Sequence, residues 1–491
     1  MRAASTLFIT AAVALFGHVT FNRANQQRDH KTNNHVTNHR VTNRLANFII
    51  NGDVRKRNSD SESGEGEVWA FLVSGSRGWI NYRHQSDVLA VNFMLRNFGI
   101  PKDRILIMMI DDIPFHKKNP YPGKVYHWPG SPDFNEGVNK DYTGKDVTIE
   151  NVLRLLHGAD MTGRGSGRTL QMQQNDRLFV YIVDHGAVGF LTIGNDMLTA
   201  KKLNHALKKI SAERKFKKAM VYIEACESGS MFDGILPDNI HVYGSTASSP
   251  REDSLSSFCN EIYDPKLLRN RSLAERDEED GKYYMPCLSD TWTYMWTQNA
   301  FRQRNLMSET IGEQFTLVRQ HLKGDSIASH YGDLSIEQDR NALLRADQKR
   351  DVPKDTLTAR LKRAVSIEER KRLRRKLSRL KKKRRYVDSV VREIELKSVH
   401  HVKNRRQRNQ AKSDETGRVR SPACHERLLN EFHRRCFNFA KHPYAGKVAS
   451  RSLNKLCNVM KADSSVEAEN RVVNAMKETC DILIHKPKRV L

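Results

Sequence analysis

The chain contains the stretch Val180-Tyr181-Ile182-Val183-Asp184-His185-Gly186, and a second stretch of the same kind follows at Val221-Tyr222-Ile223-Glu224-Ala225-Cys226-Glu227-Ser228-Gly229. Each begins with β-branched and aromatic residues and ends in polar residues and glycine, which is typical of a buried strand followed by a loop. Apolar runs of this kind lie at Val68–Val73, Ile105–Ile110, Leu178–Val183, Met220–Ile223 and Ile240–Tyr243. Helix-like stretches separate them at 84–98, 148–158 and 198–210. This alternation predicts a doubly wound, mostly parallel α/β sheet flanked by helices.

Both quoted strands end next to a side chain that can take part in nucleophilic chemistry. If the two strands are neighbours, His185 and Cys226 emerge together at the carboxyl edge of the sheet, where such folds place their active sites. An imidazole can take the proton of a thiol, and the resulting thiolate is the nucleophile. Backbone N–H groups around Gly186 and Cys226 could then stabilise an oxyanion. We therefore expect Cys226 as nucleophile and His185 as general base.

Each of these residues has a simpler interpretation when it is taken alone. A His-Gly pair after a strand is more often a loop histidine, and a lone cysteine after a strand is more often a core residue. The seven cysteines favour the reactive interpretation, because three bridges in an oxidising compartment leave one thiol free. Four of the seven lie at positions 424, 436, 457 and 480, which indicates a small disulfide-bridged module in the last part of the sequence.

The formal net charge of +26 is concentrated in one part of the chain. Residues 349–420 carry 27 Lys and Arg against 9 Asp and Glu, whereas residues 67–348 carry 34 against 36. The run 370–385 has leucines at helical spacing, which indicates a basic amphipathic helix. The simpler interpretation of its charges is a solvated helix face or a flexible tether. Nucleic-acid binding is not expected, because only Tyr386 could stack on a base among these cations.

The two ends of the chain differ in character. Residues 1–20 read as a secretory signal peptide with an apolar core too short to span a bilayer, and residues 21–66 read as a disordered leader. No later segment has the run of roughly 18 apolar residues that a membrane helix needs. The expected organisation continues with a catalytic domain at 67–335, a basic linker at 336–420 and a helical module at 421–491. A sequon at Asn270 is compatible with glycosylation in the secretory pathway.

Several motifs closely resemble the legumain (asparaginyl endopeptidase) family of caspase-like cysteine peptidases. They are the segments around His185 and Cys226, together with Asn81-Tyr82-Arg83-His84-Gln85, Asp141-Tyr142-Thr143-Gly144-Lys145-Asp146-Val147-Thr148 and Leu236-Pro237-Asp238-Asn239-Ile240. The resemblance covers about residues 67–335 and resumes from 424 to 480. It implies a caspase-like α/β catalytic domain followed by an all-α, disulfide-bridged prodomain.

The resemblance also implies roles for individual residues. Cys226 is the nucleophile, His185 the base, and Asn81 the residue that orients the histidine. The expected specificity pocket consists of Arg83, His84, Glu224 and Asp290. A side-chain amide presents both a donor and acceptors, so a pocket for asparagine needs carboxylates and a basic donor together. Such a pocket would admit aspartate only when that carboxyl is protonated, so cleavage after Asp is expected at acidic pH.

The family's bridges imply the pairs Cys424–Cys457 and Cys436–Cys480 in the prodomain and Cys259–Cys287 in the catalytic domain. The chain also departs from the family. Arg77 replaces a common asparagine, residues 260–286 are longer and more charged, and residues 353–402 contain no asparagine for self-cleavage. The nearest candidates for a processing site are Asn341, Asp347, Asp351, Asp355 and Asn404.

The expected function is that of a cysteine endopeptidase zymogen that hydrolyses bonds after Asn and is inhibited by its own prodomain until acid-triggered processing. Peptide and protein substrates are the expected partners, with cystatin-like proteins as further inhibitors, and no metal or organic cofactor is expected. The expected location is a lysosome-like or vacuole-like acidic compartment or the cell exterior. Three alternatives are a peptide ligase, a transamidase that attaches lipid anchors, and a non-catalytic interaction protein on the same fold.

Overall fold

A computed structural model of the chain describes residues 66–259, 285–302, 310–322, 326–338, 366–399, 418–460 and 466–485, with residues 354, 357, 358, 361 and 364. Contacts divide the chain into residues 1–41 and 42–491, and all described residues belong to the second unit. The expected signal peptide, nearly all of the expected leader, the sequon at Asn270 and the candidate processing sites in the linker lie outside the described residues.

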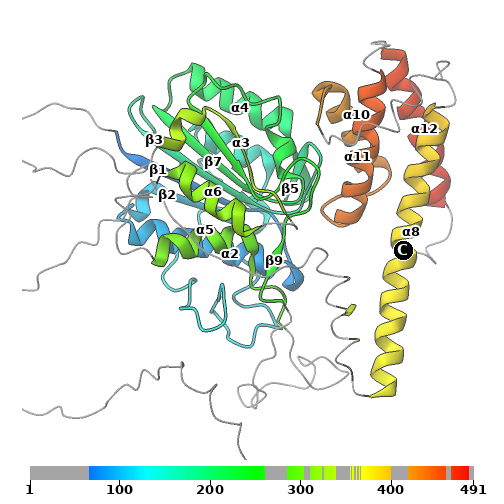
Figure 1. The fold of residues 1–491 in the computed structure, drawn as a ribbon, viewed down its shortest axis with the longest axis horizontal. Helices are drawn as coiled ribbons and strands as arrows, with labels where there is room; N and C mark the ends of the chain where they lie inside the picture. Colours follow the sequence, from blue (N-terminus) through cyan, green and yellow to red (C-terminus); the bar gives the residue numbers. More distant parts are fainter. Residues whose placement is uncertain are drawn as a thin grey trace, which may run out of the picture. The chain divides into compact units, whose positions relative to one another are not determined.

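A six-stranded sheet organises the catalytic region (Figure 1). Its strand order is β11-β8-β7-β3-β1-β2, and every pairing is parallel except that of β11 with β8. The strands are β1 (Val68–Ser74), β2 (Ile105–Met109), β3 (Arg177–Val183), β7 (Lys218–Glu224), β8 (Val242–Thr246) and β11 (Ser329–Gly332). The expected fold class is thereby confirmed for the sheet.

Helices cover both faces of this sheet, so its strands are apolar on both sides. Along β1, Ala70 and Leu72 face one core cluster while Phe71 and Val73 face another. The first cluster includes residues of α2 (Tyr82–Asn97), α5 (Thr291–Arg302) and α6 (Ile311–His321), and the second includes residues of α3 (Ile149–Leu156) and α4 (Ala200–Ala212). Short 3₁₀ turns lie at η1 (Trp79–Asn81), η2 (Lys102–Arg104), η3 (Gly144–Asp146), η4 (Ser228–Met231) and η7 (Leu334–Gln338).

Two features differ from the sequence prediction. The strand expected at 240–243 begins at Val242, because His241 has a φ of 54°, a left-handed conformation that a strand does not accommodate. A small antiparallel sheet of β4 (Gly186–Ala187), β5 (Phe190–Ile193) and β6 (Asp196–Thr199) was not predicted. It follows His185 directly and therefore shapes the carboxyl edge of the large sheet. A further pair, β9 (Ser256–Ser257) with β10 (Ser289–Asp290), is also antiparallel.

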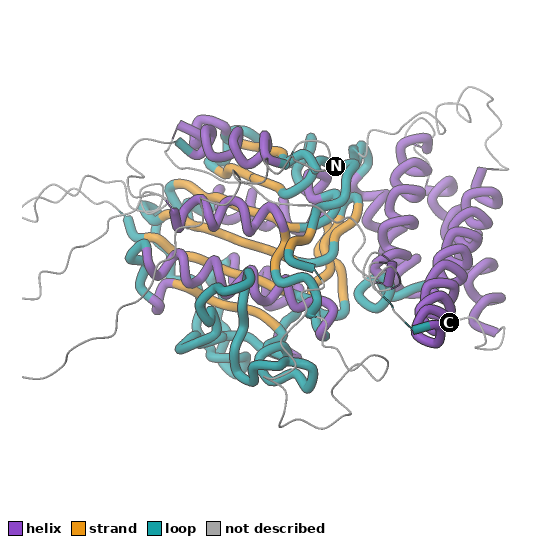
Figure 2. Tube along the Cα trace, turned by 60° about the horizontal axis from the view of Figure 1, so that its bottom comes forward, coloured by secondary structure: helices purple, strands orange, loops and turns teal. Residues whose placement is uncertain are grey.

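The C-terminal helices lie side by side (Figure 2). They are α8 (Ile367–Val399), α10 (Pro422–Arg435), α11 (Pro443–Met460) and α12 (Val466–His485). Their apolar core also includes Ala187, Phe190 and Met197 of the small sheet. The bridges Cys424–Cys457 and Cys436–Cys480 connect this helical module internally, while Cys259–Cys287 lies in the catalytic region. These are the pairs that the family resemblance implied. Helix α8 extends well beyond the basic run, and its Val387, Val390, Val391 and Ile394 pack into the core of the module, so the expected linker contributes to the module.

A buried carboxylate fastens the loop after β2 to the sheet edge. Asp141 accepts hydrogen bonds from the Ile107 backbone N–H (2.9 Å), the Ser166 hydroxyl (2.9 Å) and the Arg168 guanidinium (2.8 Å). Its removal leaves the buried Ile107 N–H without its acceptor and the Arg168 guanidinium without its carboxylate partner.

We therefore expect Asp141→Ala to lower the free energy of unfolding by about 3 kcal/mol and the first melting transition by roughly 6–12 °C. Differential scanning calorimetry of the full chain measures this shift. The exposed Asp103→Ala change is the matched control and should stay within about 0.5 kcal/mol of the parent. Equal melting curves for the two variants would contradict the assigned role of Asp141.

Candidate active site

The register of two parallel strands brings the expected reactive residues together. Val183 of β3 pairs with Glu224 of β7, and the next residues of each strand lead into His185 and Cys226. The two loops pack so closely that a Cβ on Gly186 would collide with the carbonyl oxygen of Cys226. The glycine after His185 is thus required by this close approach rather than by an unusual backbone angle.

The ring of His185 hydrogen-bonds to Asn81, the residue that the family resemblance pairs with it. The Asn81 side-chain N–H₂ donates to the carbonyl of Arg77 (2.9 Å), so its oxygen is the atom that faces His185 Nε2 at 2.9 Å. Nε2 must therefore carry the proton and donate it, which leaves Nδ1 as the basic nitrogen. Burial, with the nearby Arg83 charge as a smaller cause, lowers the pKa of His185 to about 3. The imidazole is consequently neutral and able to accept a proton.

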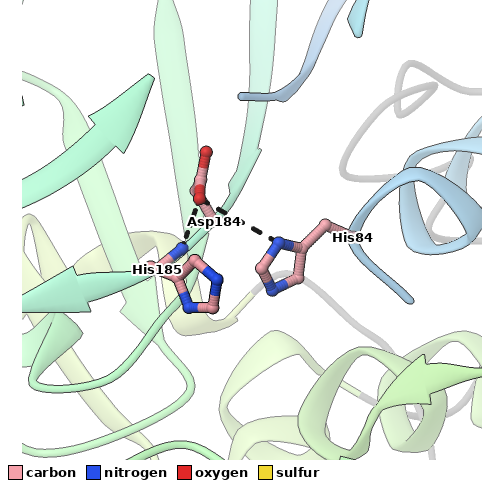
Figure 3. A group of neighbouring side chains, drawn as sticks. All are labelled: His84, Asp184 and His185. Atoms are coloured by element: carbon pink, nitrogen blue, oxygen red, sulfur yellow. Dashed lines mark hydrogen bonds and ion pairs between the residues drawn. The ribbon is translucent and has the colours of Figure 1, made fainter. Parts of the chain in front are cut away.

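Asp184 holds the backbone of the histidine. One carboxylate oxygen accepts the His185 backbone N–H (2.5 Å) and the Thr192 hydroxyl (2.8 Å). Burial raises the pKa of Asp184 to about 8, so around neutral pH the group is largely uncharged. Figure 3 shows this carboxyl between His84 and His185, whose rings meet edge to face at 5.0 Å. Asp184 directly precedes His185 in the sequence, and this position is a signal for its role in holding the histidine. The sequence analysis did not assign that role.

Cys226 is a free, half-buried cysteine. Its sulfur lies 3.9 Å from the hydroxyl of Ser254. Burial raises the pKa of the Cys226 thiol, and the carboxylates of Asp253 and Glu227 raise it further. In this state of the chain the sulfur is therefore held as a protonated thiol, which is a poor nucleophile.

The four expected pocket residues form a buried polar cluster. The Arg83 guanidinium donates to Asp290 at 2.8 Å, and His84 Nε2 lies 3.6 Å from the other oxygen of the same carboxylate. Glu224 accepts from the backbone N–H and the hydroxyl of Thr293, at 2.9 and 3.0 Å. Burial raises the pKa of both Glu224 and Asp290, and the Asp290 charge raises that of Glu224 further.

Two carboxylate oxygens of this cluster accept no hydrogen bond. They are Glu224 Oε1 and Asp290 Oδ2, and both are buried. Buried acceptors without a donor are costly, so they mark the place where a ligand with N–H groups would be stabilised.

Other residues of the site were not predicted. Ser76 bonds His84 Nδ1 at 2.6 Å, and Ser256 donates to Asp290 at 3.1 Å. His127 bonds Asp87 at 2.6 Å, and Asp87 in turn accepts the Asp290 backbone N–H at 3.2 Å. Small hydroxyls and distant acids carry no local sequence signal, so only the fold reveals these contacts.

Two groups within the described residues could offer three ligands to a metal ion, with ligand atoms within 4.8 Å of one another. They are His84-Asp184-His185 and Cys226-Glu227-Asp253. In the first group, one ring nitrogen of each histidine and one carboxylate oxygen are engaged with Ser76, Asn81 and Thr192. Both groups consist of residues that already belong to the site.

The helical module contacts this edge of the catalytic region. On α11, the Lys447 ammonium donates to Asp253 at 2.7 Å, and Arg451 forms an ion pair with Glu227. Away from the cysteine, Phe439 stacks on Phe190 of β5, with ring centroids 5.1 Å apart. Two cations of the module thus cover the carboxylates that lie beside Cys226.

Comparison with known proteins identifies the family. A model of the peptidase C13 family matches residues 68–345. The chain belongs to the peptidase C13 family. Its relatives include legumain of Mus musculus, 31% identical over 86% of this chain and 94% of the relative, and hemoglobinase of Schistosoma japonicum, 33% identical over 76% and 85%. A vacuolar-processing enzyme of Arabidopsis thaliana is 35% identical over 57% of each chain.

Among solved structures, caspase-1 of Spodoptera frugiperda matches 58% of this chain and 93% of its own, with 12% identity and a TM-score of 0.29. Membership of the C13 family makes this chain a cysteine endopeptidase, that is, a hydrolase of peptide bonds. None of the described helices of this C13 peptidase is both long and apolar enough to cross a membrane.

The hydrogen bond from Asn81 leads to a spectroscopic prediction. In ¹⁵N-histidine-labelled C13 peptidase, the His185 ring should remain neutral with the proton on Nε2 from about pH 7.5 down to about pH 4.5, because its lowered pKa lies below that range. Asn81→Ala removes the acceptor and should allow the Nδ1-protonated form to appear. Titration of His185 between about pH 5.5 and 7.5, or a proton on Nδ1 in the parent, would contradict this assignment.

Proposed function

We propose that this C13 peptidase is a zymogen that, once activated, hydrolyses peptide bonds after asparagine with Cys226 as nucleophile and His185 as base. The observation that carries the proposal is that one buried oxygen each of Glu224 and Asp290, beside the Arg83 guanidinium, accepts no hydrogen bond. An asparagine side chain supplies two N–H donors for the carboxylates and a carbonyl oxygen for the cation. An apolar side chain would leave all of these groups unpaired.

The chemical steps follow from the tautomer of His185. Nδ1 takes the thiol proton, the Cys226 sulfur attacks the backbone carbonyl carbon of the bound asparagine, and the amine of the following residue leaves with a proton from His185. Water then attacks the thioester, with the same imidazole as base, and releases the acid. Backbone N–H groups at Gly186 and Cys226 are proposed to donate to the oxyanion.

We further propose that the helical module inhibits the enzyme. Lys447 and Arg451 lie on the carboxylates next to the cysteine, and the sulfur is held as a thiol with a raised pKa. Substrate entry therefore requires α11 to move away. The names of the plant relatives point to a vacuole, and an acidic compartment of this kind fits an enzyme whose inhibitor is held by carboxylates.

The pH dependence of this inhibition follows from Glu227. Burial raises the pKa of Glu227 to about 7, and Arg451 is the main cause that lowers it. Because Arg451 lowers this pKa, the docked module favours ionised Glu227. The contact between Arg451 and ionised Glu227 therefore stabilises the docked module above pH 7. This stabilisation is lost as the pH falls through about 7, because the Glu227 carboxylate then gains a proton.

Cleavage of matched peptides tests the proposed specificity. After incubation at about pH 4–5.5, kcat/KM for a peptide with Asn before the scissile bond should exceed that for its Gln counterpart by roughly 10- to 200-fold, because Gln adds one methylene. An Asp peptide should be cleaved only as the pH approaches about 4, where its side chain gains a proton. Mass spectrometry distinguishes the hydrolysed acid from a ligated product. Turnover by Cys226→Ala, or equal rates for Asn and Gln, would overturn the proposal.

Labelling of the intact chain tests the inhibitory contact. A thiol-reactive peptide probe should label Cys226 slowly at pH 7.5 and faster as the pH falls below about 7. Arg451→Gln should raise the labelling rate at pH 7.5 about tenfold, because it removes the partner of a buried carboxylate. Arg427→Gln, which lies on α10 and pairs with Glu469 inside the module, is the matched control and should label like the parent. A labelling rate that does not depend on pH and is unchanged in Arg451→Gln would contradict the proposed inhibition by the helical module.

A further inference from the structure

The carboxylates of Glu227 and Asp253 have no assigned task once the module has moved away. Both lie beside the nucleophile, since their ligating oxygens and the Cys226 sulfur fall within 4.8 Å of one another. The Glu227 side chain is fully buried and one of its oxygens accepts no hydrogen bond. Glu227 also has a φ of 48°, a strained conformation for a residue other than glycine, which is common at functional positions.

The inhibited chain itself shows which chemistry this acidic pair binds. Two cationic side chains of α11 lie on it, Lys447 on Asp253 and Arg451 on Glu227. Arg451 also donates to the backbone carbonyl of Arg251 at 3.1 Å. A polypeptide segment with basic side chains therefore already fits beside the sulfur. When it leaves, two carboxylates at the site lose their partners.

The path of the chain between the nucleophile and the pocket places Asp253 relative to a substrate. Ser254 contacts the Cys226 sulfur, and Ser256, two residues further on, hydrogen-bonds Asp290 of the pocket. Asp253 precedes Ser254, so the chain runs from Asp253 past the Cys226 sulfur to the pocket. We infer that a peptide whose asparagine occupies the pocket extends its leaving-group side toward the Asp253 end of this path.

We propose that Glu227 and Asp253 form an acidic subsite of the activated enzyme, which selects peptides with lysine or arginine just after the scissile asparagine. This inference rests on the proposed cleavage after asparagine and names the substrate class within it. An ammonium or guanidinium group in the subsite takes the place of the Lys447 and Arg451 side chains. Acidic side chains in the same position are repelled.

The sequence of this chain contains a substrate of the required kind. Asn404, one of the candidate processing sites, is followed by Arg405 and Arg406. A subsite for basic residues would direct the enzyme to this bond within its own linker. The charge pattern of the segment that covers the site in the inhibited chain thus recurs after Asn404, where cleavage would break the covalent link between α8 and the other helices of the module.

Three fluorogenic peptides that differ only after the asparagine test the subsite. They carry Asn-Arg-Arg, Asn-Gln-Gln and Asn-Glu-Glu, and a fourth peptide places the two arginines before the asparagine. For the activated parent enzyme at about pH 7.5 and low salt, above the pKa of about 7 that Glu227 has in the inhibited chain, we expect kcat/KM to be roughly tenfold higher for Asn-Arg-Arg than for Asn-Gln-Gln, and lowest for Asn-Glu-Glu. This preference should shrink as salt is added, because it arises between partly exposed charges.

A variant with a matched control assigns the effect to the subsite. In Asp253→Asn the ratio between the Arg and Gln peptides should fall to within about twofold. Asp103→Asn removes an exposed carboxylate next to the amino end of β2, the opposite edge of the sheet, and should keep the parent ratio. If Asp253→Asn does not yield folded enzyme, the salt series and the three peptides still test the parent.

The possible failures are distinguishable. If the Gln-flanked peptide is not cleaved at all, the proposed function fails. If all three peptides are cleaved equally, or if arginines help only before the asparagine, the function stands and the acidic subsite is overturned. If Asp253→Asn keeps the parent ratio of kcat/KM between the Arg and Gln peptides, the assignment of the preference to Asp253 is overturned.

Discussion

Backbone pairing between β3 and β7 places Val183 opposite Glu224, and the positions of both reactive side chains follow from that register. A slip of one residue would turn His185 or Cys226 to the wrong face of the sheet. The register is held because both strands are buried on both faces and pack into two separate apolar clusters. The same pairing explains why a glycine must follow the histidine, since the loop after β3 lies directly against the loop after β7. Reactivity here depends on a sheet that cannot shift without exposing apolar side chains on both of its faces.

The edge defined by this register carries an unusual number of buried acids. Asp87, Asp184, Glu224 and Asp290 are each at most 3% exposed, with Arg83 as the main counter-charge. Such groups lose hydration on folding, and an arginine compensates for only part of that loss. The large cores on both faces of the sheet stabilise the fold enough to hold this arrangement. In return the pocket presents desolvated acceptors in fixed positions, and a ligand that lacks matching donors gains nothing by entering it.

Local patterns in the sequence were sufficient to predict the central strands and the pair His185 and Cys226. Each of these residues follows an apolar run whose length and composition indicate a buried strand. Contacts between distant segments were not accessible in this way. The ion pair of Arg83 and Asp290 joins residues 207 positions apart, and only the family resemblance had assigned both to one pocket. The β4–β6 sheet was missed because its strands have only two to four residues. Helix α8 was recognised by its charges, yet its packing depends on the valines and the isoleucine that follow the basic run.

The two bridges of the helical module begin and end within it, and no disulfide between described cysteines joins it to the catalytic region. While the chain is intact, the tether keeps the module at a high effective concentration beside the cysteine. A cut between α8 and α10 would leave α10, α11 and α12 connected to one another but not to the enzyme. Occupancy of the site would then obey mass action, and dilution alone would favour dissociation. In a confined compartment, the same released helices could return and bind another copy of the enzyme.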